Sequence, residues 1–256
     1  MTKRFDVKFP LANGTLEKRT AYIYLPDSYF ENPEKRYPVL YMFDGHNVFF
    51  DSDATFGKSW GMKEYMEKTK TQLIIAAVEC NHSPNNGRLE EYSPFTFRNP
   101  EVGYVAGRGK ATMEWFVNVF KKQIDANYRT LSDRKHTFIA GSSMGGLMSI
   151  YALMEYNHVF SRAAALSPSL WASPVEVQDL LLTAHFEPDT ILYVDYGSDE
   201  FGNHKNMRRA FGEFATLMMW RKLSLHCRIV PNGTHCEASW EKQIPFFMET
   251  LLYDLE

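Results

Sequence analysis

Hydrophobic and polar positions change their period several times along the chain, beginning with alternation near the start. Residues 5–9 alternate between apolar and polar side chains, and residues 20–25 resume a strand pattern after Asn13-Gly14, a dipeptide typical of tight hairpin turns. Residues 37–43 and 73–78 are short, nearly continuous apolar runs, as in strands buried on both faces of a parallel sheet. The pattern predicts an antiparallel hairpin followed by a buried sheet.

Strand and helix patterns alternate through the rest of the chain. Strands are predicted at residues 138–140, 162–166, 191–196 and 225–230, and helices at 112–127, 144–156, 174–184, 203–221 and 238–252, the last one kinked at Pro245. This succession favours one α/β domain over residues 1–256: a mostly parallel central sheet with N-terminal antiparallel strands and helices on both faces. Residues 81–110, rich in Asn, Gly, Pro and Arg, form a long connection that is either a partial lid or a surface excursion.

Composition excludes several classes of function. The net charge of -3 lacks the basic excess of a nucleic-acid-binding protein, and the apolar stretches are too short to cross a membrane. No apolar signal region follows the first basic residues, and the cysteines (Cys80, Cys227 and Cys236) have neither disulfide nor zinc-site spacing. We therefore expect a cytoplasmic protein without a metal; the oligomeric state stays open.

The most informative motif is Gly141-Ser142-Ser143-Met144-Gly145, which lies between a predicted strand and a predicted helix. A serine in this setting is typical of a nucleophile elbow, where flanking glycines permit a sharp, strained turn. The motif predicts acyl-transfer chemistry with Ser143 as the nucleophile.

A serine hydroxyl needs a base, and the base needs a group that orients it. His235 follows the last predicted strand behind Gly233, so it should lie at the same edge of the sheet as the elbow. In enzymes with such an elbow the acid lies between serine and histidine in the sequence. For this acid we favour Glu200 over Asp199, and Asp195 is less suitable because it lies inside the predicted strand. The alternative is that Glu200 and Asp199 only cap the following helix.

The oxyanion that forms during acyl transfer needs backbone N–H donors. The amide of Met144, directly after the nucleophile, is one candidate. The turn Asp44-Gly45-His46-Asn47 after an earlier buried strand offers the amide of His46 as the second.

These residues resemble the Putative esterase family, which includes esterase D, feruloyl esterases, enterochelin esterases and mycolyltransferases. The resemblance covers most of the chain and rests on residues 39–45, on 88–94, on Gly-Ser-Ser-Met-Gly-Gly at 141–146, on 197–200, and on 233–235 with Trp240. It implies an α/β-hydrolase fold without cofactor, with Ser143, His235 and Glu200 as triad and the amides of His46 and Met144 as oxyanion donors. Some members work with a Ser-His dyad, and Gly-Thr-His replaces the usual Gly-Gly-His here.

The sequence therefore predicts a serine carboxylic ester hydrolase that acts on a small-molecule, sugar or siderophore ester. An acyltransferase with the same acyl-enzyme and a catalytically silent binding module are the alternatives. Candidates for lining the substrate cleft are Asn47, Trp60, Arg88, Trp171 and Trp240. For Arg88 and the three tryptophans, a role in packing or in an ion pair is the alternative.

Overall fold

The computed structural model describes residues 1–202 and 205–255, and within them eight strands form one sheet. The strand order is β1-β2-β4-β3-β7-β8-β9-β10, with β1 and β2 antiparallel to their neighbours and the remaining strands parallel. The bounds of these strands are β1 (Thr2–Pro10), β2 (Leu16–Tyr24), β3 (Val39–Met42), β4 (Ile74–Val78), β7 (Thr137–Ser142), β8 (Arg162–Leu166), β9 (Ile191–Gly197) and β10 (Ser224–Val230). The predicted mostly parallel sheet with an antiparallel start is confirmed.

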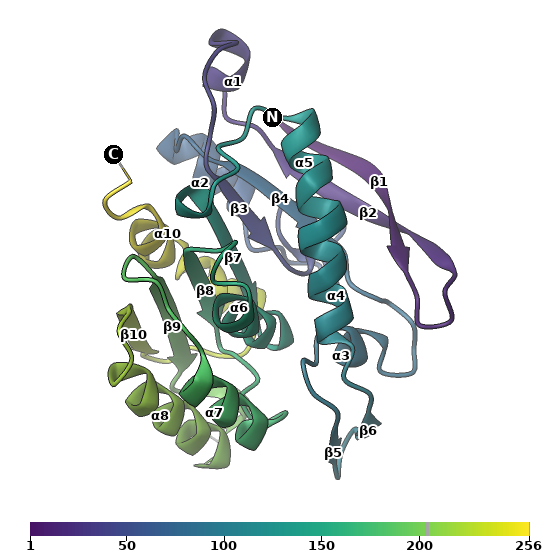
Figure 1. Ribbon diagram of the computed structural model, residues 1–256, viewed down its shortest axis with the longest axis vertical. Helices are drawn as coiled ribbons and strands as arrows, with labels where there is room; N and C mark the ends of the chain where they lie inside the picture. Colours follow the sequence, from purple (N-terminus) through teal and green to yellow (C-terminus); the bar gives the residue numbers. More distant parts are fainter. Residues whose placement is uncertain (203–204, 256) are drawn as a thin grey trace.

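Helices cover both faces of the sheet (Figure 1). Side chains of successive β7 residues alternate between two apolar clusters, because neighbouring strand residues point to opposite faces. One cluster includes α4 (Gly109–Trp115), a π-helical segment η2 (Phe116–Lys121), α5 (Lys122–Asn127), α6 (Met144–Glu155), α7 (Pro174–Thr183) and α8 (Lys205–Met219). The other includes α2 (Met62–Thr69), α9 (Glu237–Glu241) and α10 (Ile244–Leu252).

Two predicted helices differ in detail from the observed ones. The helix expected over 238–252 is two helices, α9 and α10, because Pro245 occupies the first turn of α10, where its missing N–H costs nothing. The helix expected from Asn203 is described from Lys205 onward, and residues 203–204 lie outside the described residues.

The connection at 81–110 is folded rather than a long open loop. It contains α3 (Gly87–Glu91), a hairpin of β5 (Phe97–Asn99) and β6 (Gly103–Val105), and the start of α4. Short elements elsewhere are α1 (Ser28–Glu31), η1 (Gly45–Asn47), η3 (Arg134–His136) and η4 (Glu200–Gly202). In the described part of the chain, no helix combines the length and apolarity needed to cross a bilayer.

Candidate active site

The backbone turns sharply at Ser143, between β7 and α6. Ser143 has φ 57° and ψ -120°, a conformation that costs an L-residue free energy and is retained where the surroundings enforce it. A Cβ on Gly141 would lie 2.6 Å from the carbonyl carbon and oxygen of Gly145. The first glycine of the motif is therefore required by close contact between the strand end and the first turn of α6.

The Ser143 hydroxyl is half-buried in a cleft that His235 also lines. Its Oγ lies 3.3 Å from the Oγ of Ser169, a residue that the sequence reasoning missed. Across residues 1–202 and 205–255, no hydrogen bond joins Ser143 to His235. The structure thus brings the two side chains to one cleft with the serine hydroxyl turned toward Ser169.

His235 is held by a buried carboxylate. Its Nδ1 lies 3.0 Å from Oε2 of Glu200, which is only 1% exposed. The other carboxylate oxygen accepts a hydrogen bond of 2.8 Å from the backbone N–H of Gly197 and one from the hydroxyl of Ser167. Because these donors fix Glu200, its remaining oxygen holds the imidazole in one orientation, with Nε2 free of this contact.

Aromatic side chains enclose the imidazole. The ring centroid of His235 lies 4.4 Å from that of Phe201 and 5.1 Å from that of Trp240. The indole N–H of Trp240 donates a 3.0 Å hydrogen bond to Ser167 Oγ, the same hydroxyl that donates to Glu200. Trp240 therefore orients the histidine both by ring packing and through Ser167.

The competing acidic residues lie elsewhere. Asp195 is buried inside β9, where its carboxyl accepts hydrogen bonds from the Ser167 amide and the Tyr193 hydroxyl. Burial raises the pKa of Asp195 to about 7. Among the described residues, the carboxylate of Asp199 has a hydrogen bond only from the neighbouring Ser198 hydroxyl, at 3.3 Å. Of the three candidates, the structure places Glu200 on His235.

The turn after β3 presents the second expected oxyanion donor. Asp44 has φ 54°, and a Cβ on Gly45 would lie 2.8 Å from the backbone of Val78, so only glycine allows η1 to pack on the end of β4. The amides of His46 and Met144 both lack a hydrogen-bond partner among the described residues. Both are thus available to an acceptor in the cleft.

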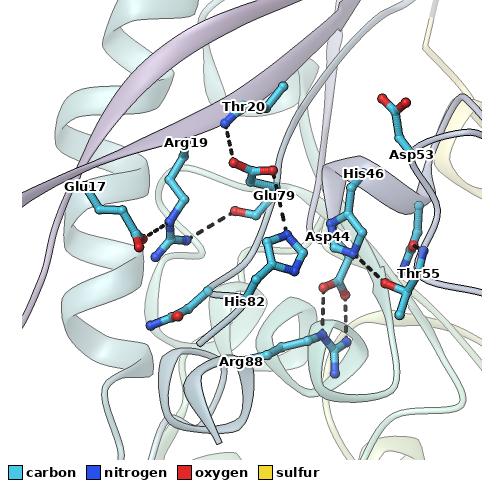
Figure 2. A network of polar contacts seen from close by, with 12 residues as sticks. Glu17, Arg19, Thr20, Asp44, His46, Asp53, Thr55, Glu79, His82 and Arg88 are labelled. Atoms are coloured by element: carbon cyan, nitrogen blue, oxygen red, sulfur yellow. Dashed lines mark hydrogen bonds and ion pairs between the residues drawn. The ribbon is translucent and has the colours of Figure 1, made fainter. Parts of the chain in front are cut away.

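Arg88 stabilises the turn after β3 through an ion pair with Asp44. Its Nε and Nη2 each donate a 2.7 Å hydrogen bond to the Asp44 carboxylate, a two-pronged ion pair that is visible in Figure 2. Burial opposes ionisation of Asp44, but the guanidinium outweighs it and holds the pKa of that carboxyl below its usual value. Arg88 therefore supports the His46 loop, and it also lines the cleft.

The cleft has a volume of about 410 Å³. Asn47, Arg88 and Trp240 line it, together with residues 80–84 and 86–89, so the first part of the long connection forms one of its walls. Trp171 instead packs on Phe97 and lines two other pockets, one of about 10 Å³ and one of about 440 Å³. Trp60 is buried against Trp240 in the core.

The sequence reasoning missed Ser167, Ser169 and Glu237. The two serines follow β8, a strand whose end lies at the same sheet edge as the elbow, and this position was a usable signal. Glu237 lines the cleft at the start of α9, and burial raises the pKa of its carboxyl.

Solved structures with the same fold include an IroE-like serine hydrolase from Shewanella oneidensis, with a TM-score of 0.74 and 18% identity, covering 97% of this chain and 79% of that one. A ferulic acid esterase has a TM-score of 0.73 and 18% identity, with coverage of 100% and 99%. The siderophore hydrolase EstA from Aspergillus nidulans has a TM-score of 0.67 and 15% identity, with coverage of 96% and 93%. The fold is that of the α/β-hydrolases, as predicted.

Sequence relatives lead to the same group of proteins. The chain is 22% identical over 206 residues to the uncharacterized protein YbbA of Bacillus subtilis (strain 168), which covers 79% of this chain and 77% of that protein. It is 29% identical over 148 residues to Esterase Rv1288 of Mycobacterium tuberculosis (strain ATCC 25618 / H37Rv), covering 57% of this chain but only 28% of that longer protein. The sequence model of the Putative esterase family matches residues 12–250, and the chain therefore belongs to that family.

Proposed function

We propose that this protein is a serine carboxylic ester hydrolase with Ser143, His235 and Glu200 as its catalytic triad. The observation that carries the proposal is the cleft in which a strained serine lies near a histidine whose Nδ1 is held 3.0 Å from a buried carboxylate. Membership of an esterase family supports the same reaction class. Catalytic hydrogen bonds are often long before substrate binds, so the contact of Ser143 with Ser169 is compatible with this role.

In the proposed mechanism, the Ser143 hydroxyl rotates from Ser169 toward Nε2 of His235 and attacks the ester carbonyl carbon as the imidazole takes its proton. The imidazolium that forms is stabilised by the Glu200 carboxylate on its other nitrogen. It then donates the proton to the departing alkoxide. Water, activated by the same imidazole, attacks the acyl-enzyme and releases the carboxylic acid.

The amides of His46 and Met144 would stabilise the tetrahedral oxyanion. The Met144 amide also lies at the N-terminus of α6, where the helix dipole favours negative charge. Loss of one such donor typically lowers turnover about a hundredfold to a thousandfold.

The substrate class that the cleft supports is a small-molecule ester. Its walls include charged and polar side chains, among them Arg88, Asn47 and Glu237, which suits an ester carrying hydroxyl or anionic groups. Two structural neighbours are named a ferulic acid esterase and a siderophore hydrolase, and these names support such a substrate class.

We propose a cytoplasmic location for the protein, because its cysteines are free thiols.

The test is Ser143→Ala, assayed with p-nitrophenyl acetate and with a fluorophosphonate probe that labels activated serines. Turnover should fall at least about a thousandfold, with loss of labelling and an unchanged melting temperature. The matched control is Ser142→Ala, the neighbouring motif serine, which should keep the label. Retained hydrolysis in folded Ser143→Ala protein would refute the mechanism.

A further inference from the structure

Three potential metal ligands meet where β3 and β4 end. His46 lies in η1 after β3, while Cys80 and His82 follow β4, the parallel neighbour of β3. The close packing of Gly45 on the Val78 backbone brings the two segments together. One ligand atom from each of the three residues lies within 4.8 Å of the other two.

One ring nitrogen of His46 has no hydrogen-bond partner in the described part of the chain. The residue is 5% exposed, its Nε2 lies 3.0 Å from the Thr55 hydroxyl, and its Nδ1 is buried with no hydrogen-bond partner within the described residues. An unsatisfied buried polar atom is costly and needs an explanation. A bound cation would satisfy it.

His82 lies beside a carboxylate. Its Nε2 lies 3.7 Å from Oε2 of Glu79, whose other oxygen accepts a 2.6 Å hydrogen bond from the Thr20 amide of β2. The centroids of the His82 and His46 rings lie 4.6 Å apart. Figure 2 shows the two side chains beside each other. A histidine whose second nitrogen faces a carboxylate is the usual arrangement around protein-bound zinc.

We propose that His46, Cys80 and His82 bind a divalent cation of the zinc class at the wall of the cleft. Two imidazoles and a thiolate suit zinc, whereas magnesium and calcium prefer oxygen ligands. Tetrahedral zinc needs ligand atoms about 3.5 Å apart, so the site requires a small closing movement, for which the exposed His82 side chain has room. As the metal–sulfur bond forms, the Cys80 thiol releases its proton to solvent. Water from the cleft that these three residues line would complete the coordination.

Occupation of the site inhibits the proposed hydrolase. The cation is held by the side chain of His46, the residue whose amide is a proposed oxyanion donor, and its ligands line the same cleft as Ser143 and His235. This consequence rests on the proposed function, whereas cation binding itself does not.

Cobalt(II) titration of the purified Ser143→Ala protein tests binding without reference to activity. One equivalent should produce the near-ultraviolet charge-transfer absorption of a cobalt–thiolate bond, and zinc should displace it. Cys80→Ser should abolish the absorption, and Glu79→Gln should weaken cobalt affinity about tenfold to a hundredfold. Cys236→Ser is the matched control, because Cys236 is a half-exposed thiol next to His235, and it should leave the absorption intact.

An absent absorption band, or one that persists in Cys80→Ser protein, overturns the proposal. The inhibition arm uses wild-type protein and p-nitrophenyl acetate: zinc should inhibit it, and Cys80→Ser should raise the half-inhibitory zinc concentration at least about tenfold. Equal zinc sensitivity of the two proteins would place the inhibitory ion elsewhere and refute the inhibitory role. An inactive wild-type protein would refute the proposed function while leaving the cobalt titration readable.

Discussion

Replacement of Glu200 by Gln removes one negative charge from the candidate triad while keeping the size and hydrogen-bonding oxygen of the side chain. The Gln oxygen retains an acceptor for the Gly197 amide and the Ser167 hydroxyl. The change therefore isolates the carboxylate that faces His235. It distinguishes a triad from a Ser-His dyad.

The expected magnitude follows from the 3.0 Å separation of Glu200 Oε2 and His235 Nδ1. At an effective dielectric constant of about 20, opposite unit charges at that distance attract by about 5 kcal/mol. This energy is available only after the imidazole takes the Ser143 proton, so it lowers the barrier rather than the substrate affinity. Its loss corresponds to a decrease in kcat of about a thousandfold to ten-thousandfold.

The assay is steady-state hydrolysis of p-nitrophenyl acetate, with kcat and KM measured separately. KM should change little, because Glu200 does not line the cleft. Asp199→Asn is the matched control: it removes an exposed neighbouring charge that does not contact His235, and its kcat should stay within about twofold. Full activity in Glu200→Gln protein, or a larger loss in Asp199→Asn protein, would refute the assignment of the acid.

Two further predictions concern stability. Gly141→Ala places a methyl group 2.6 Å from the Gly145 carbonyl and should lower the free energy of unfolding by about 1–3 kcal/mol in urea titrations. The control is Gly212→Ala in α8, where the added methyl group would have no neighbour within 4 Å among the described residues, so the change should be neutral or stabilising. Equal effects of the two substitutions would contradict the close-packing argument. Asp195 has a folded pKa of about 7, above its unfolded value, so the native state binds an extra proton between about pH 4 and pH 7 and wild-type stability falls as pH rises through that window. Asp195→Asn mimics the protonated form and should remove this slope, at most about 1.4 kcal/mol per pH unit; parallel stability curves for the two proteins would refute the raised pKa.

Much of the fold can be predicted from short stretches of the sequence. Apolar runs, the Asn13-Gly14 turn and the glycines around Ser143 each depend on neighbouring residues, because strand burial, turn conformation and elbow strain are set within a few positions. The order of strand and helix patterns then implied a mostly parallel sheet. The predicted roles of Ser143, His235 and Glu200 likewise rest on their positions after predicted strands.

Other features of the site depend on contacts between segments far apart in the chain, and only the tertiary structure decided them. The pairing of Arg88 with Asp44 and the link from Trp240 through Ser167 to Glu200 require distances that no sequence period encodes. The meeting of His46 with Cys80 depends on β3 lying beside β4, a choice made by packing of the whole sheet. Sequence patterns determine which face of an element is buried, whereas the partner that covers it is selected by the collective packing of the folded chain.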